Sequence, residues 1–169
     1  MAAGGGTERR LTNNDAHDDW ATFSPDGSEI AFESNREGRS EIFTMSATGA
    51  AQTRLTVTIR EISTGVFTAR ASKRPIFSPD GSRILFQAPL DDDVGQLYTS
   101  DATVEGPQVP TRLTFNNLVE VDFLWAPDGT EVLYVAFAEG EDGRLFTLGL
   151  ESARAVQILT QVASRPSWR

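Results

Sequence analysis

The chain has 169 residues, no cysteine and a formal net charge of −9 at pH 7. The lack of cysteine excludes disulfides, thiolate zinc sites and a thiol nucleophile, and the acidic balance argues against a nucleic-acid partner, because phosphates require a basic surface. No apolar run approaches the roughly 18 residues of a transmembrane helix, so we expect no membrane insertion. The length suits one domain of ordinary size.

The chain begins with a stretch of alanine and glycine after the initial methionine, residues 1–6. This stretch lacks the charged and apolar regions of a signal peptide, and we interpret it as a flexible leader. The remainder, residues 7–169, is built from repeats.

A five-residue motif with an aromatic residue, a proline and a glycine recurs along the chain. Its copies are Phe23-Ser24-Pro25-Asp26-Gly27, Phe77-Ser78-Pro79-Asp80-Gly81 and Trp125-Ala126-Pro127-Asp128-Gly129, and the approach to a fourth copy ends at Trp168. Self-similarity at this spacing indicates stacked supersecondary units.

Each copy has the chemistry of a tight turn. In the first, Pro25 fixes the backbone angle wanted at the second turn position, and Gly27 accepts a positive φ. A type I turn followed by a left-handed glycine is typical of a hairpin loop, so strands are expected on both sides. Asp26, Asp80 and Asp128 favour such turns through local backbone hydrogen bonds, and we interpret them as structural rather than catalytic or metal-binding.

Further strands follow each turn, and no segment of ten or more residues has a convincing helical period. The apolar runs directly after the turns do not alternate cleanly, as expected for strands covered on both faces. A polar glycine loop, a third strand and a Leu-Thr signature in the fourth complete each repeat. Four short antiparallel strands in series indicate a blade of a β-propeller. The second strands are expected at residues 29–32, 83–86 and 131–134, and the third strands at 41–45, 96–99 and 144–148.

We therefore predict an all-β chain with three complete blades, at about residues 20–56, 75–114 and 121–160, and an extra strand at each end. This is a partial or half propeller. An insertion at residues 57–70 is interpreted as a hairpin or long loop. The marker aromatics Phe23, Phe77, Trp125 and Trp168 lie 54, 48 and 43 residues apart, close to the roughly 40–50 residues of a four-stranded blade. The first three are predicted to be buried between neighbouring sheets.

The full repeat, from the Ser-Pro-Asp-Gly turn to the Arg-Leu-Thr signature, resembles the TolB-type propeller repeat, which also occurs in the propellers of prolyl-oligopeptidase-like peptidases. The resemblance covers residues 7–168. It implies a ring of six blades, and hence self-association as a homodimer that completes the ring. It also implies the bacterial periplasm as location if the chain is TolB-like with its signal removed, and otherwise the cytoplasm.

The remaining chemistry-bearing side chains form no catalytic pattern in the sequence. His17 has no fixed acid partner. The motif Gly-x-Ser-x-Gly, which marks a hydrolase nucleophile, does not occur. The carboxylates at residues 91–93 and 139–142 lack the alternate spacing of a calcium loop and are interpreted as solvated hairpin tips. We expect no catalytic residue, metal site or cofactor.

The innermost strand of each blade, just before the marker aromatic, approaches the central channel of a propeller, where ligands and partner peptides are received. One register across the blades contains Trp20, Arg74, Asp122 and Arg165. Alternatively, the charges of these strands only pair with one another along a wet tunnel. The predicted channel-mouth residues are Asp18, Asp19, Lys73, Arg74, Glu120, Asp122 and Arg165.

The leading functional hypothesis is a non-enzymatic, TolB-like propeller that presents its channel mouth and loops to a protein or peptide. One alternative is an accessory propeller that gates substrate to a prolyl-oligopeptidase-like serine peptidase domain. Another is a carbohydrate-binding propeller, for which Phe67 and Phe115 are the only candidate exposed aromatics outside the repeat positions.

Overall fold

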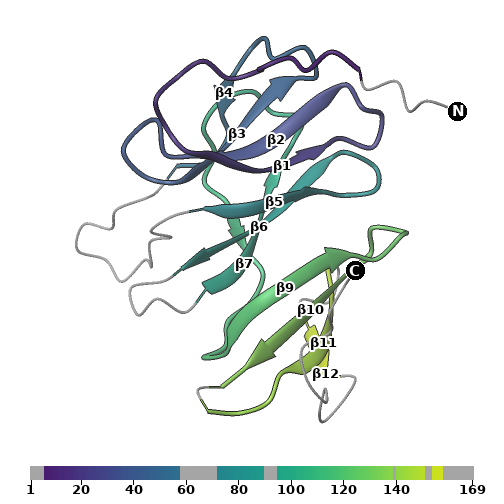
Figure 1. The fold of residues 1–169 in the computed structure, drawn as a ribbon. Coiled ribbons are helices and arrows are strands. Elements are labelled where there is room, and N and C mark those ends of the chain that lie inside the picture. The colour runs from purple at the N-terminus through teal and green to yellow at the C-terminus, as the bar shows by residue number, and fades with distance from the viewer. Residues whose placement is uncertain (1–5, 58–71, 90–94, 139, 151–153, 158–169) are drawn as a thin grey trace, which may run out of the picture.

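Residues 6–57, 72–89, 95–138, 140–150 and 154–157 are described by the computed structural model of the chain (Figure 1). Within this part the chain forms strands and no helix, as the repeat predicts, so none of the described segments is a helix suited to cross a membrane. Outside the described residues lie the first five residues, nearly all of the insertion, the carboxylates at 91–93, Arg165 and Trp168.

The described strands form three antiparallel sheets, each with four strands in chain order, and each sheet is one blade. Blade 1 comprises β1 (Asp18–Phe23), β2 (Glu29–Ser34), β3 (Glu41–Ser46) and β4 (Thr53–Arg54). Blade 2 comprises β5 (Lys73–Phe77), β6 (Arg83–Pro89), β7 (Gly95–Asp101) and β8 (Thr111–Arg112). Blade 3 comprises β9 (Val119–Trp125), β10 (Glu131–Phe137), β11 (Arg144–Gly149) and β12 (Arg154–Gln157). In Figure 1 the blades follow one another as layers that do not close into a ring.

Each copy of the five-residue motif forms the loop between the first and second strands of its blade. The amide of Gly27 donates a 2.9 Å hydrogen bond to the carbonyl of Ser24, and Gly81 and Gly129 make the same bond to the residues three positions before them. The φ angles of the three glycines are 72°, 76° and 72°, in the left-handed region that the turn type requires. Residues with a Cβ are disfavoured there, which explains why glycine recurs.

The aspartate side chain of each motif stabilises the same turn by accepting hydrogen bonds. Asp26 Oδ1 accepts hydrogen bonds from the Ser24 hydroxyl at 2.6 Å and from the Ser28 amide at 3.0 Å. Asp80 repeats both contacts in blade 2, and Asp128 accepts from the amide two positions later. The hydroxyl bond, together with the amide bond, lowers the pKa of Asp26 and of Asp80 to about 2.

Side chains alternate between the two faces of each blade. We call the face turned toward the preceding blade the front face. It carries the marker aromatic and a pair of aromatic rings from the second and third strands. The ring centroids lie 5.9 Å apart for Phe32 and Phe43, 6.0 Å for Phe86 and Tyr98, and 5.1 Å for Tyr134 and Phe146, distances at which aromatic pairs attract one another.

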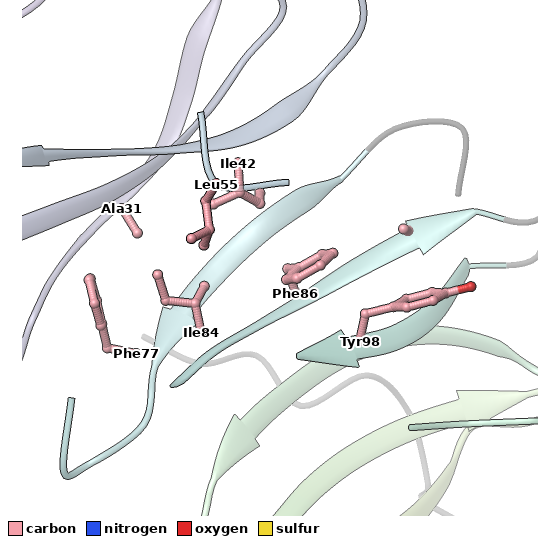
Figure 2. Packing of buried hydrophobic residues seen from close by; sticks show 8 residues of the cluster. Ala31, Ile42, Leu55, Phe77, Ile84, Phe86 and Tyr98 are labelled. Atoms are coloured by element: carbon pink, nitrogen blue, oxygen red, sulfur yellow. The ribbon is translucent and has the colours of Figure 1, made fainter. Parts of the chain in front are cut away.

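The opposite face, the rear face, carries aliphatic side chains and packs on the front face of the next blade. Between blades 1 and 2, the rear-face residues Ala31 and Ile42 share one buried cluster with Phe77, Ile84 and Phe86 (Figure 2). Full burial of one such side chain contributes roughly 1.5–3 kcal/mol, so this packing holds the blades together. Leu85, Leu97, Trp125, Val132 and Tyr134 repeat the arrangement between blades 2 and 3.

Among the described residues, the leucines of three Leu-Thr signatures pack on these buried clusters. Leu55 follows β4 and lies in the cluster between blades 1 and 2, and Leu113 follows β8 and packs on the cluster between blades 2 and 3. Leu11 packs on the front face of blade 1 in the same way, although residues 6–17 form no strand. The expected extra strand at this end is not formed. A fourth strand forms by pairing with the third strand of its own blade, and no described strand precedes residues 6–17. The extra strand at the other end lies outside the described residues.

The marker aromatics differ in burial. Phe77 and Trp125 are 6% and 7% exposed, as predicted for side chains between neighbouring sheets. Phe23 is 61% exposed, so the prediction of burial is wrong for blade 1. The reason is that Leu11 packs on a cluster that does not include Phe23, and no described blade lies in front of Phe23.

Candidate functional site

The innermost strands of blades 1 and 2 are irregular at the same place. The pairing of β1 with β2 and of β5 with β6 shifts register in mid-strand. Trp20 and Arg74 lie within these shifts and have φ angles of 52° and 56°. A positive φ is uncommon for such large side chains and costs of order 1–3 kcal/mol each. Bulges re-aim side chains and occur often next to functional sites, so this position is the candidate site.

Arg74 joins the three blades at this position. Its guanidinium carbon lies 5.0 Å from the Trp20 ring centroid and 5.3 Å from the Phe123 ring centroid, within cation–π range. Its Nη2 donates to Asp122 Oδ1 at 2.8 Å, and its Nη1 donates to the Val121 carbonyl. Trp20, Arg74 and Asp122 therefore form a continuous row of contacts from blade 1 to blade 3, which we call the inner row.

The inner row is open to solvent. Trp20 is 59% exposed, and the side chain of Asp122 is 54% exposed. Asp19 and Lys73, which precede Trp20 and Arg74 on β1 and β5, are exposed as well. Of the seven predicted channel-mouth residues, Asp19, Lys73 and Asp122 are thus exposed, and Arg74 and Asp122 belong to the row of contacts that begins at Trp20.

Asp18 is held within blade 1. Its Oδ1 lies 3.0 Å from Arg36 Nη2, and its Oδ2 accepts a 3.1 Å hydrogen bond from Asn14 Nδ2. Only 14% of its side chain is exposed. Burial alone would raise the pKa of Asp18, but hydrogen bonds from Ser34, Arg36 and two residues of the N-terminal segment outweigh it and lower this pKa to about 2.

Glu120 is buried more completely, with 1% of its surface exposed. Its Oε2 accepts a 3.0 Å hydrogen bond from the Thr114 hydroxyl, and its Oε1 accepts a 3.1 Å bond from Asn116 Nδ2. Burial raises the pKa of Glu120 to about 7, since its hydrogen bonds and the charge of Arg112 offset only part of the lost hydration. The carboxylate therefore does not reach the surface at which the sequence reasoning placed it.

Asp18 and Glu120 share a sequence signal that the search for a channel mouth missed. Each is the last residue of the pattern Leu-Thr-x-Asn-x-x-x-Asp/Glu, at residues 11–18 and 113–120. In both copies the asparagine Oδ1 accepts from the amide two positions later, at 2.8 and 2.9 Å, and the arginine before the leucine donates to the threonine carbonyl. The pattern encodes a structural network between a Leu-Thr signature and the first strand of the blade that follows it.

Chemically, the inner row offers stacking and charged hydrogen bonds. Its indole, guanidinium and carboxylate groups are suited to hold a polypeptide segment. Within the described part of the chain, no group of three or more His, Asp or Glu side chains could hold a metal ion. His17 is exposed and contacts Asn35 through its backbone, donating its amide to Asn35 Oδ1 at 3.0 Å.

No family model matches the chain, but its fold matches solved β-propellers. A protein of Agrobacterium tumefaciens assigned as TolB aligns with a TM-score of 0.69 at 20% identity, over 92% of this chain and 53% of that one. Oligogalacturonate lyase from Vibrio parahaemolyticus aligns with a TM-score of 0.64 at 11% identity, over 89% and 43%. The β-propeller domain of the Trilobed protease from Pyrococcus furiosus aligns with a TM-score of 0.57 at 18% identity, over 83% and 41%.

The chain has a β-propeller fold with the blade pattern of the TolB type. It spans about half the length of this TolB structure, and less than half of the lyase and of the protease's propeller domain. Structures with this fold include both TolB and enzymes, so the fold by itself does not define the function.

Proposed function

We propose that the chain is a non-enzymatic β-propeller module that binds a protein or peptide, with the inner row as its contact surface. The observation that carries the proposal is the exposed Trp20, held at a positive φ and stacked on Arg74. Tryptophan and arginine are the side chains that most often dominate binding energy at protein interfaces. A side chain that is already fixed by its backbone and its neighbour loses little entropy on binding.

The charged side chains of the innermost strands support the same proposal. Asp19 and Lys73 are exposed on the neighbouring strands β1 and β5, and Asp122 closes the row on β9. Charges of both signs around an aromatic anchor select the orientation of a polypeptide and reject wrong partners. Arg165 is predicted to extend this lining, and it lies outside the described residues.

A peptide-display selection tests the proposal directly. The immobilised chain is panned with a random peptide library, the recovered peptides are synthesised, and their Kd is measured by fluorescence anisotropy. Trp20→Ala is expected to weaken binding about 30-fold, the effect of losing a hot spot of about 2 kcal/mol. The matched control is Phe115→Ala, because Phe115 is also exposed, at 76%, and is stacked by Arg112 with 4.6 Å between the guanidinium carbon and the ring centroid. This control is expected to leave Kd unchanged.

Two outcomes count against this function. Either no recovered peptide depends on Trp20, or the purified chain turns over a substrate in a hydrolase, lyase or oxidoreductase panel and loses that turnover when Asp122 is replaced by alanine. If the chain acts as a TolB-like protein whose signal has been removed, its location is the bacterial periplasm; otherwise it is the cytoplasm.

Two alternative functions follow from the similarity to propeller enzymes. The Trilobed protease propeller favours an accessory role beside a peptidase domain, and a Ser-His-Asp domain encoded in the same gene would support it. The oligogalacturonate lyase favours carbohydrate binding. Binding of oligogalacturonate that is lost in Phe115→Ala and kept in Trp20→Ala would support that alternative.

A further inference from the structure

The dipeptide Asp-Gly occurs four times in the chain, and three of the four copies belong to the repeated turn. The copies are Asp26-Gly27, Asp80-Gly81, Asp128-Gly129 and Asp142-Gly143. In such a pair the backbone nitrogen of the glycine can attack the side-chain carboxyl of the aspartate, because glycine has no Cβ to hinder the close approach. The structure places the four copies in two different surroundings.

The three turn copies are held in a form that opposes this attack. In each of them the glycine amide donates a 2.9 Å hydrogen bond to the carbonyl three positions before it, so the nitrogen is already engaged. The aspartate carboxylate accepts a 3.0 Å hydrogen bond from the amide two positions after it. These bonds must break before the nitrogen and the carboxyl carbon can join, and breaking them costs free energy.

The protection is graded among the turns. In blades 1 and 2 the serine two positions before the aspartate also donates its hydroxyl to the carboxylate, at 2.6 Å. Blade 3 has Ala126 at that position, so Asp128 lacks this bond. Asp128 is therefore held less firmly than Asp26 and Asp80.

The fourth copy lacks both restraints. Asp142 and Gly143 lie between β10 and β11, outside any strand, and Asp142 is exposed. Within the part of the chain that the structure describes, neither the Asp142 carboxylate nor the Gly143 amide makes a hydrogen bond. The neighbouring Glu141 pairs with Arg144 at 2.6 Å, so the cation of this loop is taken by a different carboxylate.

From this contrast we propose that Asp142 is a site of spontaneous isomerisation to isoaspartate in the folded protein, whereas the three turn aspartates are protected. The Gly143 nitrogen forms a bond to Cγ of Asp142. The carboxyl group loses its OH and the amide loses its hydrogen, which leave together as one water. The five-membered imide then takes up one water: opening at the main-chain carbonyl of Asp142 leaves the chain running through Cγ, and opening at Cγ restores aspartate.

The product has a distinct chemistry. Isoaspartate lengthens the main chain between β10 and β11 by one methylene group and carries a free α-carboxylate, the group that isoaspartyl methyltransferases recognise. The aged chain is therefore a substrate for enzymes of this class. The site lies on a different loop from the inner row, so the inference does not depend on the proposed function.

Mapping of isoaspartate tests the proposal. The full chain is incubated folded in mildly acidic buffer at physiological temperature, and isoaspartate at the four sites is quantified by mass spectrometry with electron-transfer fragmentation. Asp142 is expected to isomerise about 10-fold faster than Asp26 or Asp80, the factor that corresponds to about 1.4 kcal/mol, close to the net worth of one hydrogen bond. Asp128 is expected to fall between them.

The same incubation in urea separates structure from sequence. All four aspartates precede glycine, so their rates are expected to become similar once the chain is unfolded. Equal rates at the four sites in the folded chain, or the same preference for Asp142 in urea, would overturn the proposal.

Methylation gives a second readout. The aged chain is incubated with an isoaspartyl methyltransferase and radiolabelled S-adenosylmethionine. Asp142→Glu is expected to remove nearly all methyl incorporation, because the longer side chain would have to close a less favourable six-membered ring. Asp15→Glu is the matched control, since Asp15 is also exposed and outside any strand but precedes alanine, and it is expected to leave incorporation unchanged. Incorporation that survives Asp142→Glu would assign the modification to another residue.

Discussion

Asp18 and Glu120 occupy equivalent positions, each five residues before the marker aromatic of its blade, and their surroundings move their pKa values in opposite directions. Burial raises the pKa of Glu120 to about 7, whereas the pKa of Asp18 is lowered to about 2 because its hydrogen bonds outweigh its burial. Asp18 accepts hydrogen bonds from Ser34 and from Arg36, whose Nη2 lies 3.0 Å from its Oδ1. Glu120 is buried more completely, and its hydrogen bonds and the charge of Arg112 offset only part of that burial.

This contrast predicts the pH dependence of stability. The pKa of Glu120 rises from its ordinary value of 4.5 to about 7 on folding, so the folded chain binds the proton more tightly than the unfolded chain. The stability that follows is fully present below pH 4.5 and is lost as pH rises through about 7. The loss is expected to be on the order of 3 kcal/mol, measured as the free energy of unfolding in urea at pH 4.5 and pH 8.

Glu120→Gln isolates this effect, because glutamine keeps the shape and does not titrate. The variant is expected to lose less stability than the unaltered chain between pH 4.5 and pH 8. Equal losses in both proteins would assign the pH dependence to other groups. On the acid side, Asp18, Asp26 and Asp80 act in the opposite sense: their lowered pKa values predict stability that is present above pH 4 and lost as pH falls toward 2.

The Thr114 hydroxyl is expected to matter as much as the carboxylate it contacts. It accepts a 2.9 Å hydrogen bond from the Leu97 amide and donates to Glu120, and the residue is 3% exposed. Thr114→Val keeps the shape but leaves a buried amide without its acceptor, which costs about 1–3 kcal/mol. Chemical denaturation measures the change in free energy of unfolding. Thr103→Val is the control, because Thr103 is exposed and its hydroxyl bond to Asp101 is local; equal costs at both sites would contradict the prediction.

A second pair of substitutions compares a covered marker aromatic with an uncovered one. Trp125→Ala is expected to lower the free energy of unfolding by about 3–5 kcal/mol, since the side chain is 7% exposed between two blades and its removal leaves a cavity. Phe23→Ala is expected to cost under about 1 kcal/mol, because the ring is 61% exposed. Both changes are measured by urea unfolding. A loss below about 1 kcal/mol for Trp125→Ala would refute the packing of blade 3 on blade 2.

The fold was predictable from the sequence because each blade carries its own complete set of local signals. Pro25 and Gly27 specify the turn, and the strand on each side follows from the hairpin that this turn requires. Burial of Phe23 was predicted wrongly for a physical reason: the repeat defines what a position can pack against, but burial depends on whether a neighbouring blade is present. The sequence of blade 1 does not contain that information.

The candidate site was predictable only in part. The register of Trp20, Arg74 and Asp122 was readable from the alignment of the repeats, but their contacts depend on bulges and positive φ angles. Such strained backbone has no propensity signal at non-glycine residues. Glu120 was misplaced because an acid on an inner strand was assumed to face the channel. The asparagine four residues earlier, Asn116, was the signal that this acid is held internally.

The glycine of the repeated turn gives a final test, because the effect of its backbone angle can be separated from the effect of the space around it. Gly81 has a φ of 76°, and a Cβ added there would meet Pro25 Cδ at 3.6 Å, an ordinary contact. Any cost of substitution therefore arises from the backbone angle. Gly81→Val is expected to destabilise by about 1–2 kcal/mol or more, because a β-branched residue is poorly tolerated at positive φ. Gly81→Asn is the matched control, since asparagine adopts this region far more readily. The midpoints of urea unfolding should rank the unaltered chain first, the asparagine variant second and the valine variant last, and an equal midpoint for valine and asparagine would contradict the left-handed turn.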